Sequence, residues 1–366
     1  MKKILLVYHA LSSGEFSYAG MEKMLIWLGN SLSEAGYDVT FCTLFDTERS
    51  SKYSSKAKSI ELGLCYSHSF FQRNITTFIT GTKLLHKVLK SKYDYVINFG
   101  DTCFFLILFL KTLHNYKMIT SERGDPNNSA NYLEKLRRKL IKYSDVIVFQ
   151  TEGAKSFFPE LVRHKSLVIA NPITIPLECW SRDSCEKRIA FVGRIDFWQK
   201  RPDILIKAFD IVHKKHPEYM LDICGSGAEL NRLRGIVNDS ELSQSVILHG
   251  AVQDVRSVLL NSEIFVLTSD FEGIPNALLE AMALGMPVVA TDCTPGGAAL
   301  LIDNGINGFL VKKGDFNNVA DSVCKFIEDA SLERRMAENA RKSMYRFLPH
   351  EILNQWKQLF GYEREN

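Results

Sequence analysis

The stretch IFVLTSDFEGIPNALLEAMALGMPVVA, residues 264–290, decides the fold class of this chain. An apolar run, Ile264–Leu267, is followed by a polar loop, an amphipathic segment at Ala277–Ala283, a Gly-Met-Pro turn and a second apolar run, Val288–Ala290. Apolar runs of this length, joined through a helical segment, are typical of buried parallel strands with a crossover helix. The stretch therefore predicts a parallel α/β sheet that binds its ligands at the carboxyl ends of the strands.

The same alternation of apolar runs and helical stretches continues along the chain. The runs lie at Ile4–Tyr8, Val39–Leu44, Tyr95–Phe99, Met118–Thr120, Val146–Phe149, Leu167–Ala170, Ile189–Val192, Tyr219–Cys224, Val246–Leu248, Ile264–Leu267, Val288–Ala290 and Phe309–Val311. Helical stretches such as Met21–Ala35 and Asp203–His213 separate them. The alternation breaks at Pro172–Glu186, where prolines and a Ser/Asp/Arg cluster indicate a linker. We therefore predict two doubly wound Rossmann-like domains, at residues 1–172 and 187–342, with a linker at 173–186.

Composition and charge agree with two globular domains that have different partners. The chain has 366 residues, of which 46% are hydrophobic and 24% charged, which excludes a disordered tail, a collagen-like fibre and a disulfide-stapled miniature. Residues 1–175 carry 23 Lys and Arg against 15 Asp and Glu, a balance of +8. Residues 176–366 carry 22 against 27, a balance of −5. A basic half followed by an acidic half predicts two bodies with different ligands.

Cysteine usage and apolar run lengths predict a cytoplasmic protein. The eight cysteines form no CxxC pair, and several lie in apolar runs, as buried thiols of a reducing compartment do. The first residues resemble a signal peptide, but Tyr8 and His9 end the apolar run early, so we expect a buried first strand. The most apolar stretch, Cys103–Leu110, has eight residues where a membrane span needs about 20.

Two glutamates stand out in the deciding stretch. Glu272 lies in the loop before the helical segment, and Glu280 lies about one turn inside it. With Asn276 as the expected N-cap, backbone N–H groups at the start of the helix would form an anion site beside both carboxylates. The alternative is that both are solvated surface charges, although a carboxylate in the apolar segment around Glu280 requires a partner.

With these residues in view, the chain resembles the retaining nucleotide-sugar glycosyltransferases of family 4. Glu272 and Glu280 match the E-x7-E motif of that family, and Gly193-Arg194 with Lys200 resembles its G-R…K segment. The resemblance implies a GT-B architecture, two Rossmann-like domains facing a central cleft. It also implies that Glu272 contacts the donor sugar, Glu280 the ribose, and Arg194 and Lys200 the diphosphate. Two cations can stabilise a departing nucleoside diphosphate without a metal; the alternative for either cation alone is an ordinary surface charge.

The resemblance extends to a set of small and apolar residues around the donor. It implies donor contacts for Gly20, Gly193, Gly225, Gly227, Val252, Gly273, Ile274, Pro275 and Asn276, with Val252 near the base. Gly20 would follow a flexible loop after the first strand, at residues 12–18. No acidic residue follows a GxGxxG sequence at the spacing of a dinucleotide fingerprint, which disfavours a nicotinamide dehydrogenase.

The first half departs from the family at one position. Many members carry a histidine where this chain has Ser121-Glu122-Arg123-Gly124. Glu122 could orient the acceptor hydroxyl and Arg123 could offer a planar fork to phosphate, which makes both catalytic candidates. The alternative, weighed equally, is a structural Glu–Arg pair.

The basic balance of the first half comes largely from two clusters. One contains Lys83, Lys87, Lys90 and Lys92; the other lies on an expected helix at 132–143 and contains Lys135, Arg137, Arg138, Lys139 and Lys142. One interpretation is a solvated helix face. The other is attachment to the inner face of the cell membrane, at ~1 kcal/mol per basic side chain near anionic lipid. Nucleic acid is disfavoured because no aromatic residues are interleaved.

These observations lead to one functional hypothesis and two alternatives. We expect transfer of a hexose or N-acetylhexosamine from a nucleotide sugar, with UDP as the expected nucleotide. The acceptor would be a saccharide or a lipid-linked saccharide in capsule, exopolysaccharide or lipopolysaccharide assembly. No metal and no cofactor are expected, because no Asp-x-Asp follows a strand as a metal-dependent sugar transferase needs. The alternatives are a GT-B sugar-nucleotide epimerase and a non-catalytic sugar-nucleotide-binding partner. The segment 343–362 is expected to pack back on the first domain.

Overall fold

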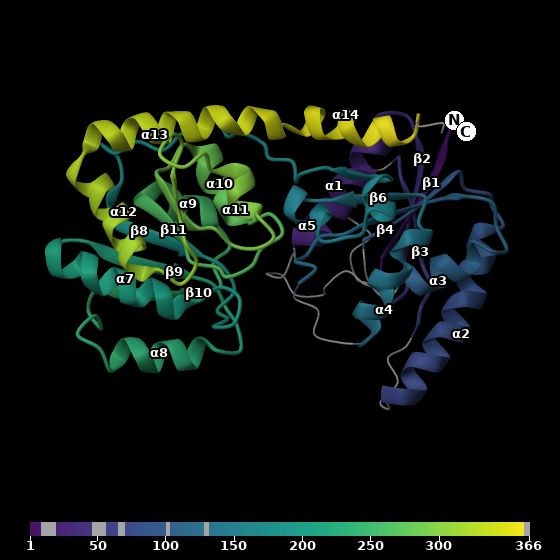
Figure 1. Cartoon of the computed structure of the whole chain (residues 1–366), viewed down its shortest axis with the longest axis horizontal. Coiled ribbons are helices and arrows are strands. Elements are labelled where there is room, and N and C mark those ends of the chain that lie inside the picture. Colours follow the sequence, from purple (N-terminus) through teal and green to yellow (C-terminus); the bar gives the residue numbers. More distant parts are fainter. Residues whose placement is uncertain (9–19, 46–55, 65–69, 100–102, 128–131, 362–366) are drawn as a thin grey trace. The chain divides into compact units, whose positions relative to one another are not determined.

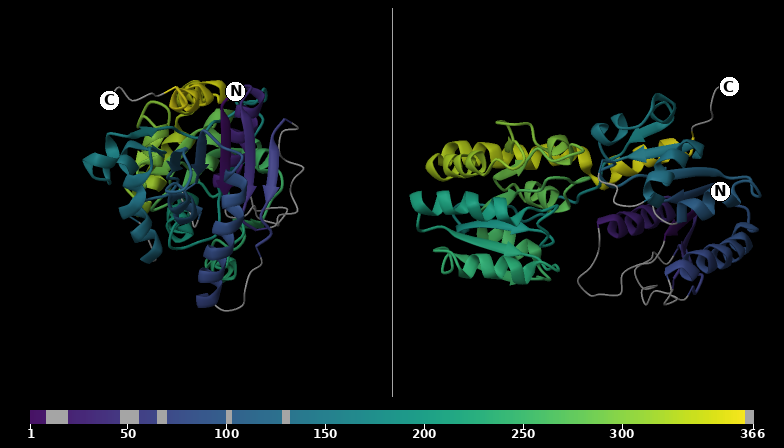
Figure 2. Two further views of the ribbon diagram at one scale, coloured as in Figure 1. Left: turned by 90° about the vertical axis from the view of Figure 1, so that its right-hand side faces the viewer. Right: turned by 60° about the horizontal axis from the view of Figure 1, so that its bottom comes forward.

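The computed structural model contains two α/β units. It describes residues 1–8, 20–45, 56–64, 70–99, 103–127 and 132–361. One unit comprises Met1–Ile169 with Leu353–Asn366, and the other comprises Ala170–Ile352. Each has a sheet whose described pairings are all parallel, with helices on both faces (Figures 1 and 2). The doubly wound α/β fold predicted from the alternation is therefore confirmed.

The first unit is built on a seven-stranded sheet of order β3-β2-β1-β4-β5-β6-β7. Its strands are β1 (Lys3–Tyr8), β2 (Asp38–Thr43), β3 (Lys58–Glu61), β4 (Tyr95–Asn98), β5 (Lys117–Ser121), β6 (Val146–Phe149) and β7 (Ser166–Val168). Its helices are α1 (Gly20–Glu34), α2 (Phe70–Leu89), α3 (Cys103–Leu110), α4 (Tyr132–Leu140) with the 3-10 turn η2 (Ile141–Tyr143), α5 (Glu152–Ser156) and α6 (Glu160–Arg163).

Alternate residues of β1 explain how this sheet is covered on both faces. Leu5 and Val7 belong to the core that also contains the buried residues of α2 and α3. Leu6 points to the opposite face, because successive side chains of a strand alternate. There α1 lies so close that a Cβ on Gly29 would overlap the side chains of Leu6 and Phe41. Both faces are thus apolar, as a continuous apolar strand requires.

The edge strand β3 was not predicted. Its residues Lys58–Glu61 read KSIE, and most of their side chains are exposed. A short polar strand at a sheet edge lacks the apolar run by which buried strands are recognised, and its charges protect the open edge from further pairing.

The second unit is built on a six-stranded sheet of order β10-β9-β8-β11-β12-β13. Its strands are β8 (Glu186–Val192), β9 (Met220–Cys224), β10 (Val246–Gly250), β11 (Ser262–Leu267), β12 (Val288–Thr291) and β13 (Phe309–Val311). Its helices are α7 (Pro202–Lys215), α8 (Leu230–Asn238), α9 (Val255–Asn261), α10 (Asn276–Leu284), α11 (Gly297–Leu301), α12 (Phe316–Glu328) and α13 (Ala330–Ser343) with the turn η3 (Met344–Phe347). The last helix, α14 (Pro349–Leu359), crosses the boundary between the units.

The predicted linker packs on the second unit. Trp180 is buried; its backbone N–H donates to Leu284 O at 2.8 Å and its indole Nε1 donates to Ser262 O at 3.0 Å. Arg182 forms an ion pair with Glu263 at 3.0 Å, and its guanidinium also donates to the carboxyl of Glu333. The second unit therefore begins at Ala170, whereas the sequence predicts a domain that begins at residue 187.

Only the last part of the chain returns to the first unit. The rings of Phe99 and Trp356 stack with centroids 6.4 Å apart, and the Tyr95 hydroxyl donates to Phe360 O at 2.9 Å. Residues 343–352, included in the predicted return, belong instead to the second unit. Trp356 is fully buried, so α14 is part of the core of the first unit.

The most apolar helix of the first unit packs against its core and leaves Phe109 exposed. Cys103, Phe104, Leu106, Ile107 and Leu110 of α3 are buried. Among the residues that the structure describes, no helix has both the length and the apolar character needed to cross a membrane.

Candidate functional site

Loops that follow three neighbouring strands of the second sheet meet at one point. β8, β11 and β12 are adjacent and parallel, so their carboxyl ends share one edge of the sheet. The backbone N–H of Asp270 donates to Gln199 O at 2.8 Å, and that of Glu272 donates to Thr294 O at 2.7 Å. Glu272 therefore lies where the three loops are joined, at the edge where a doubly wound sheet binds its ligand.

Glu272 forms a largely buried ion pair with Lys200. One carboxylate oxygen, Oε1, contacts Lys200 Nζ and accepts a hydrogen bond from the Ser269 hydroxyl at 3.0 Å. The other, Oε2, accepts from Gln199 Nε2 at 3.4 Å. Burial, together with the nearby Glu272 carboxylate, raises the pKa of the Cys293 thiol to about 12, so this thiol stays protonated. The structure thus brings together Lys200 and Glu272, which the sequence places in two separate motifs.

Arg194 is connected to the same carboxylate through one residue that the motifs did not single out. Its side chain is 63% exposed, and its guanidinium donates to Gln199 Oε1 at 2.7 Å. The amide of Gln199 then donates to Phe271 O at 3.1 Å and to Glu272. Because an amide has an acceptor and two donors, Gln199 links the exposed cation to the buried anion.

The turn that carries these residues has a signal in the sequence. Asp196 Oδ1 accepts from the backbone N–H groups of Trp198 at 2.8 Å and Gln199 at 3.1 Å. An aspartate that binds N–H groups two and three residues later forms an Asx turn. The turn ends at Arg201, whose guanidinium pairs with Asp270 at 2.7 Å. Asp196 is therefore the residue in the sequence that indicates how this turn is stabilised.

The helix after Glu272 does not begin as predicted. Pro275 occupies the N-cap with no side-chain hydrogen bond, and Asn276 is the first helical residue. Asn276 Oδ1 accepts instead from Asn171 Nδ2 at 2.9 Å. The prediction of Asn276 as N-cap is wrong because an N-cap side chain acts from extended backbone, and only Pro275 has it here. Glu280 lies one turn inside α10 and is half-buried.

The predicted glycines let the loops pack against each other. A Cβ on Gly225 would overlap Gly193 O, and one on Gly227 would overlap Ile195 O. A Cβ on Gly297 would likewise overlap Gly273 O. Glycine is thus required here by backbone proximity within the chain.

The other predicted donor residues are spread over both units. Ile274 is buried in the loop before α10, and Val252 is half-buried in the loop after β10. Gly20 is the first residue of α1 in the first unit, and the loop 12–18 lies outside the described residues. The donor contacts expected of all these residues stay predictions.

Glu122 and Arg123 are both engaged within the first unit. Glu122 forms a buried bidentate ion pair with Arg137 at 2.6 and 3.0 Å. Arg123 is half-buried; its Nε donates to the Ser121 hydroxyl at 2.7 Å, and its guanidinium lies 5.3 Å from the Phe99 ring. Burial lowers the pKa of Arg123 to about 9. The partner of Glu122 is thus Arg137 and not the neighbouring Arg123, and the acceptor roles expected of both stay predictions.

The same pair corrects the interpretation of α4 as a uniformly basic surface. Arg137 is buried with Glu122, and Arg138 donates to Pro126 O with most of its side chain covered. Lys135, Lys139 and Lys142 remain exposed. Helix periodicity alone cannot identify a partner 15 residues away in the sequence.

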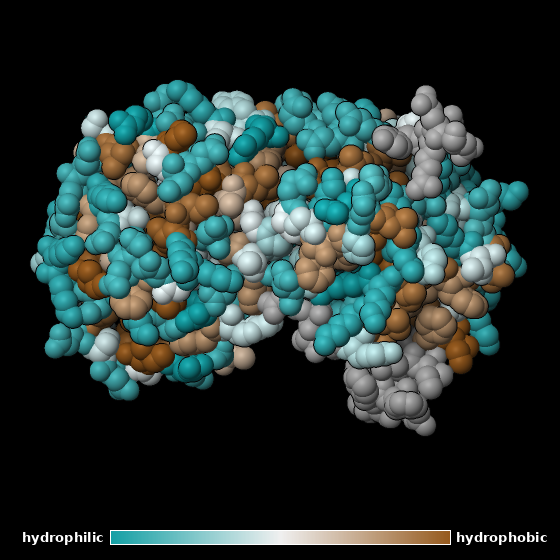
Figure 3. Space-filling view, in the orientation of Figure 1, coloured by the Kyte–Doolittle hydropathy of each residue, from teal (hydrophilic) through white to brown (hydrophobic). Residues whose placement is uncertain are grey.

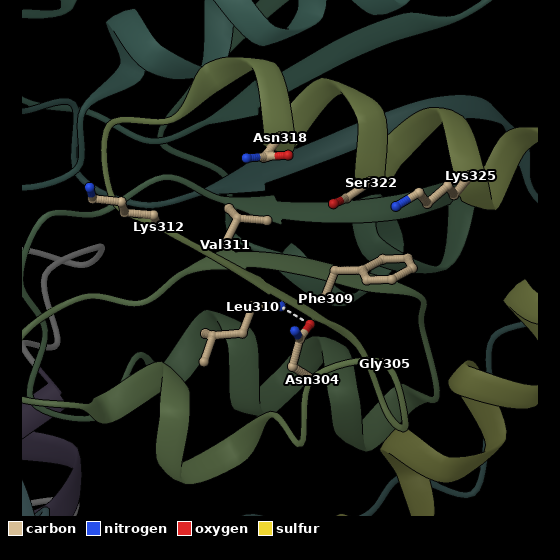
Figure 4. Close-up of a pocket in the computed structure, with 9 residues that line it drawn as sticks. All are labelled: Asn304, Gly305, Phe309, Leu310, Val311, Lys312, Asn318, Ser322 and Lys325. Carbon is tan, nitrogen blue, oxygen red and sulfur yellow. Dashed lines mark hydrogen bonds between the residues drawn. The ribbon is translucent and has the colours of Figure 1, made fainter.

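A separate cavity of about 320 Å³ lies beside the edge strand β13 (Figure 4). Leu310 N–H donates to Asn304 Oδ1 at 3.0 Å across it. Its walls come from the loop before β13, β13 itself and α12, and they contain none of the predicted donor residues: Asn304, Gly305, Phe309, Leu310, Val311, Lys312, Asn318, Ser322 and Lys325.

Comparisons with known proteins identify the family to which the second unit is similar. A family model described as Glycosyl transferases group 1 matches residues 180–343, which include every loop described above for the second unit. Over 347 residues the chain is 28% identical to an uncharacterized glycosyltransferase of Haemophilus influenzae, covering 93% of this chain and 96% of that protein.

Two further proteins match over the whole length. The chain is 25% identical over 368 residues, 99% of both chains, to the Campylobacter jejuni GalNAc-alpha-(1->4)-GalNAc-alpha-(1->3)-diNAcBac-PP-undecaprenol alpha-1,4-N-acetyl-D-galactosaminyltransferase. A Staphylococcus aureus TarM mutant, crystallised with Fondaparinux, alpha-GlcNAc-glycerol and UDP, matches with a TM-score of 0.79 at 16% identity, over 99% of this chain and 100% of that one. The chain is therefore a glycosyltransferase with the GT-B fold, and its residues 180–343 form a group 1 glycosyltransferase domain.

Proposed function

We propose that the chain is a retaining, family 4 type glycosyltransferase of cell-surface polysaccharide assembly. It transfers a hexose or N-acetylhexosamine from a nucleotide sugar, a UDP-sugar in the first place, to a saccharide or lipid-linked saccharide. The names of two relatives support this choice: the Campylobacter jejuni protein acts on an undecaprenol-linked saccharide, and TarM was crystallised with UDP. The observation that carries the proposal is the Lys200–Glu272 pair at the junction of three loops.

The ion pair with Glu272 orients Lys200, so that its positive charge is already in position for the donor. Lys200 Nζ has three N–H donors, so it can keep its contact with Glu272 and still donate to a diphosphate oxygen. Arg194, more exposed and held by Gln199, supplies a planar fork to the same group. As the bond between the sugar and the diphosphate breaks, negative charge grows on the leaving group. Two preoriented cations stabilise that charge without reorganisation of solvent.

The two glutamates serve the uncharged parts of the donor. An ionised carboxylate accepts hydrogen bonds only, which suits the hydroxyl groups of a sugar and of a ribose. Of the roughly four lone-pair sites of the Glu272 carboxylate, Lys200, Ser269 and Gln199 occupy three, and we assign the remaining one to a hydroxyl of the transferred sugar. Glu280, one turn inside α10, receives the ribose.

The reaction can be tested with a panel of UDP-, GDP- and ADP-sugars. A thermal-shift screen identifies the nucleotide. Release of nucleoside diphosphate, with the sugar transferred to water or to an added saccharide acceptor, measures turnover. Lys200→Ala should lower turnover about a hundredfold or more, the usual cost of removing one preoriented charge from a transition state. The matched control is Lys214→Ala, because Lys214 is an exposed lysine of the same unit, and it should leave turnover unchanged.

Product analysis separates the proposal from its rivals. A retaining transferase yields a product whose anomeric configuration equals that of the donor. An epimerised nucleotide sugar formed without acceptor would identify an epimerase, and tight donor binding without any release of diphosphate would identify a non-catalytic partner. Equal turnover of wild-type protein, Lys200→Ala and Glu272→Gln would refute the site assignment.

The second part of the proposal concerns the basic first unit. It contacts an anionic membrane peripherally at the cytoplasmic face, where a lipid-linked acceptor is presented. Its support is the exposed lysines of both clusters, Lys83, Lys87, Lys90, Lys92, Lys135, Lys139 and Lys142. The proposal is tested together with the surface described next.

A further inference from the structure

Helices α2 and α3 expose large apolar side chains next to each other. Phe78 and Ile79 of α2 are 39% and 49% exposed, and Phe109 of α3 and Leu113 just after it are 49% and 61% exposed. The rings of Phe78 and Phe109 meet edge to face, with centroids 6.1 Å apart. Figure 3 shows brown and tan residues beside one another in the region where Figure 1 labels α2 and α3. We call these four side chains and the lysines described next the α2–α3 surface.

Lysines continue this surface along α2 and to the residue just after it. Lys83, Lys87 and Lys90 follow Ile79 at spacings of four, four and three residues, which places all four on one helical face. All three lysines are exposed. The surface is therefore apolar at one end and positively charged along its length, so one surface presents both kinds of group by which proteins bind anionic membranes.

The helices that carry the α2–α3 surface are fixed by packing against the core of the first unit and by a hydrogen bond. Leu85 and Leu89, on the opposite side of α2, are buried in the core of the first unit. His86 and His114 share a hydrogen bond of 2.8 Å between Nδ1 and Nε2, which joins α2 to the segment after α3. The apolar groups are thus presented together, and their exposure is a property of the folded unit.

We propose that the α2–α3 surface is the part of the chain that docks on an anionic lipid bilayer. The inference deepens, and rests on, the proposed membrane contact of the first unit. The three lysines attract anionic headgroups, while the apolar side chains enter the boundary between headgroups and acyl chains. A long lysine side chain lets its charge reach the headgroups while its stem covers apolar surface.

The other basic cluster is a weaker candidate for the same role. On α4, Arg137 and Arg138 are committed to Glu122 and Pro126, which leaves Lys135, Lys139 and Lys142. Like the three lysines of the α2–α3 surface, these three lysines are all exposed. They therefore provide a control of identical charge change on another helix of the same unit.

The test is flotation of the full chain with vesicles of phosphatidylcholine, alone or mixed with phosphatidylglycerol. Wild-type protein should float with the mixed vesicles only. The variant K83Q/K87Q/K90Q should bind at least about tenfold more weakly, given the contribution of each basic group near an anionic surface, whereas K135Q/K139Q/K142Q should stay within about threefold of the wild type. Leu113→Ser should weaken binding, and Leu161→Ser should not, although Leu161 is 65% exposed in the same unit.

Turnover of a free nucleotide sugar separates this inference from the proposed function. With water or an added soluble saccharide as the acceptor, all four variants should release nucleoside diphosphate at the wild-type rate in the absence of vesicles. Absence of turnover in the wild type, with selective flotation intact, would refute the proposed reaction and leave the docking surface standing. Equal flotation of both lysine variants, or flotation on phosphatidylcholine alone, would overturn the assignment to the α2–α3 surface.

Discussion

The substitution Glu333→Gln should remove a pH dependence from the stability of the second unit. Glu333 of α13 is fully buried beside a second carboxylate, Glu263 of β11, and Arg182 contacts both. The Tyr219 hydroxyl donates to Glu263 Oε2 at 2.9 Å. One guanidinium serves two carboxylates, so burial and the charge of Glu263 raise the pKa of Glu333 to about 8.

The sign and size of the effect follow from this pKa. Glu333 ionises near 4.5 in an exposed chain and near 8 in the folded unit. The unfolded state therefore loses this proton first, and the stabilisation is complete below pH 4.5 and lost as the pH rises through about 8. The loss amounts to about 1.4 kcal/mol per pH unit in that window. From pH 6 to pH 8 the free energy of unfolding should fall by about 2–3 kcal/mol from this group.

Glutamine imitates the protonated carboxyl at any pH, so Glu333→Gln should not show this fall. Urea unfolding at pH 6 and pH 8 measures the difference, and hydrogen exchange of peptides from α13 assigns it to the second unit. The matched control is Glu338→Gln on the same helix, where the side chain is 66% exposed. Glu338→Gln should retain the pH dependence of the wild type. If wild-type protein and Glu333→Gln lost stability in parallel between pH 6 and pH 8, the reasoning from shared burial would be refuted.

Three further outcomes are expected. Arg137→Ala removes the partner of the buried Glu122 and should cost about 3–5 kcal/mol in urea unfolding, whereas Lys139→Ala on the same helix should stay within about 0.5 kcal/mol of the wild type. Gly297→Ala, whose methyl group would overlap Gly273 O, should displace the loop before α10 and lower donor turnover at least about tenfold; unchanged turnover would contradict the close packing. Chelation with EDTA should leave turnover unchanged, and activity restored only by a divalent cation would disprove the metal-independent mechanism.

The fold could be predicted because its strands are buried on both faces. Every predicted apolar run contains or overlaps a strand, from β1 to β13, since parallel strands under two layers of helices have no polar face. β3 was not predicted for the opposite reason, because its sequence KSIE forms an edge strand that faces solvent. Apolar periodicity therefore reports burial, and it fails where a strand is not buried.

The candidate site was predictable only where its residues belong to recognisable motifs. Glu272, Arg194 and Lys200 stand in recognisable segments, and the structure brings them together. Gln199 joins them through its amide, and no periodicity or spacing marks a glutamine as a bridge. The Glu122–Arg137 pair was missed because its members lie on different elements, β5's following loop and α4, and only packing brings them together.

The acidic balance of the second half does not conflict with the proposed binding of an anionic donor there. Its cations are largely neutralised within the unit: Lys200 by Glu272, Arg201 by Asp270 and Asp203. Their side chains are at most 27% exposed, whereas that of Arg194 is 63% exposed. In the proposed function, a diphosphate would therefore first meet Arg194 and then Lys200, whose ammonium group is held in place by its pairing with Glu272. The same pairing would couple the two halves of the proposed donor, because a movement of Glu272 toward the sugar would also move Lys200, the cation that we assign to the phosphate.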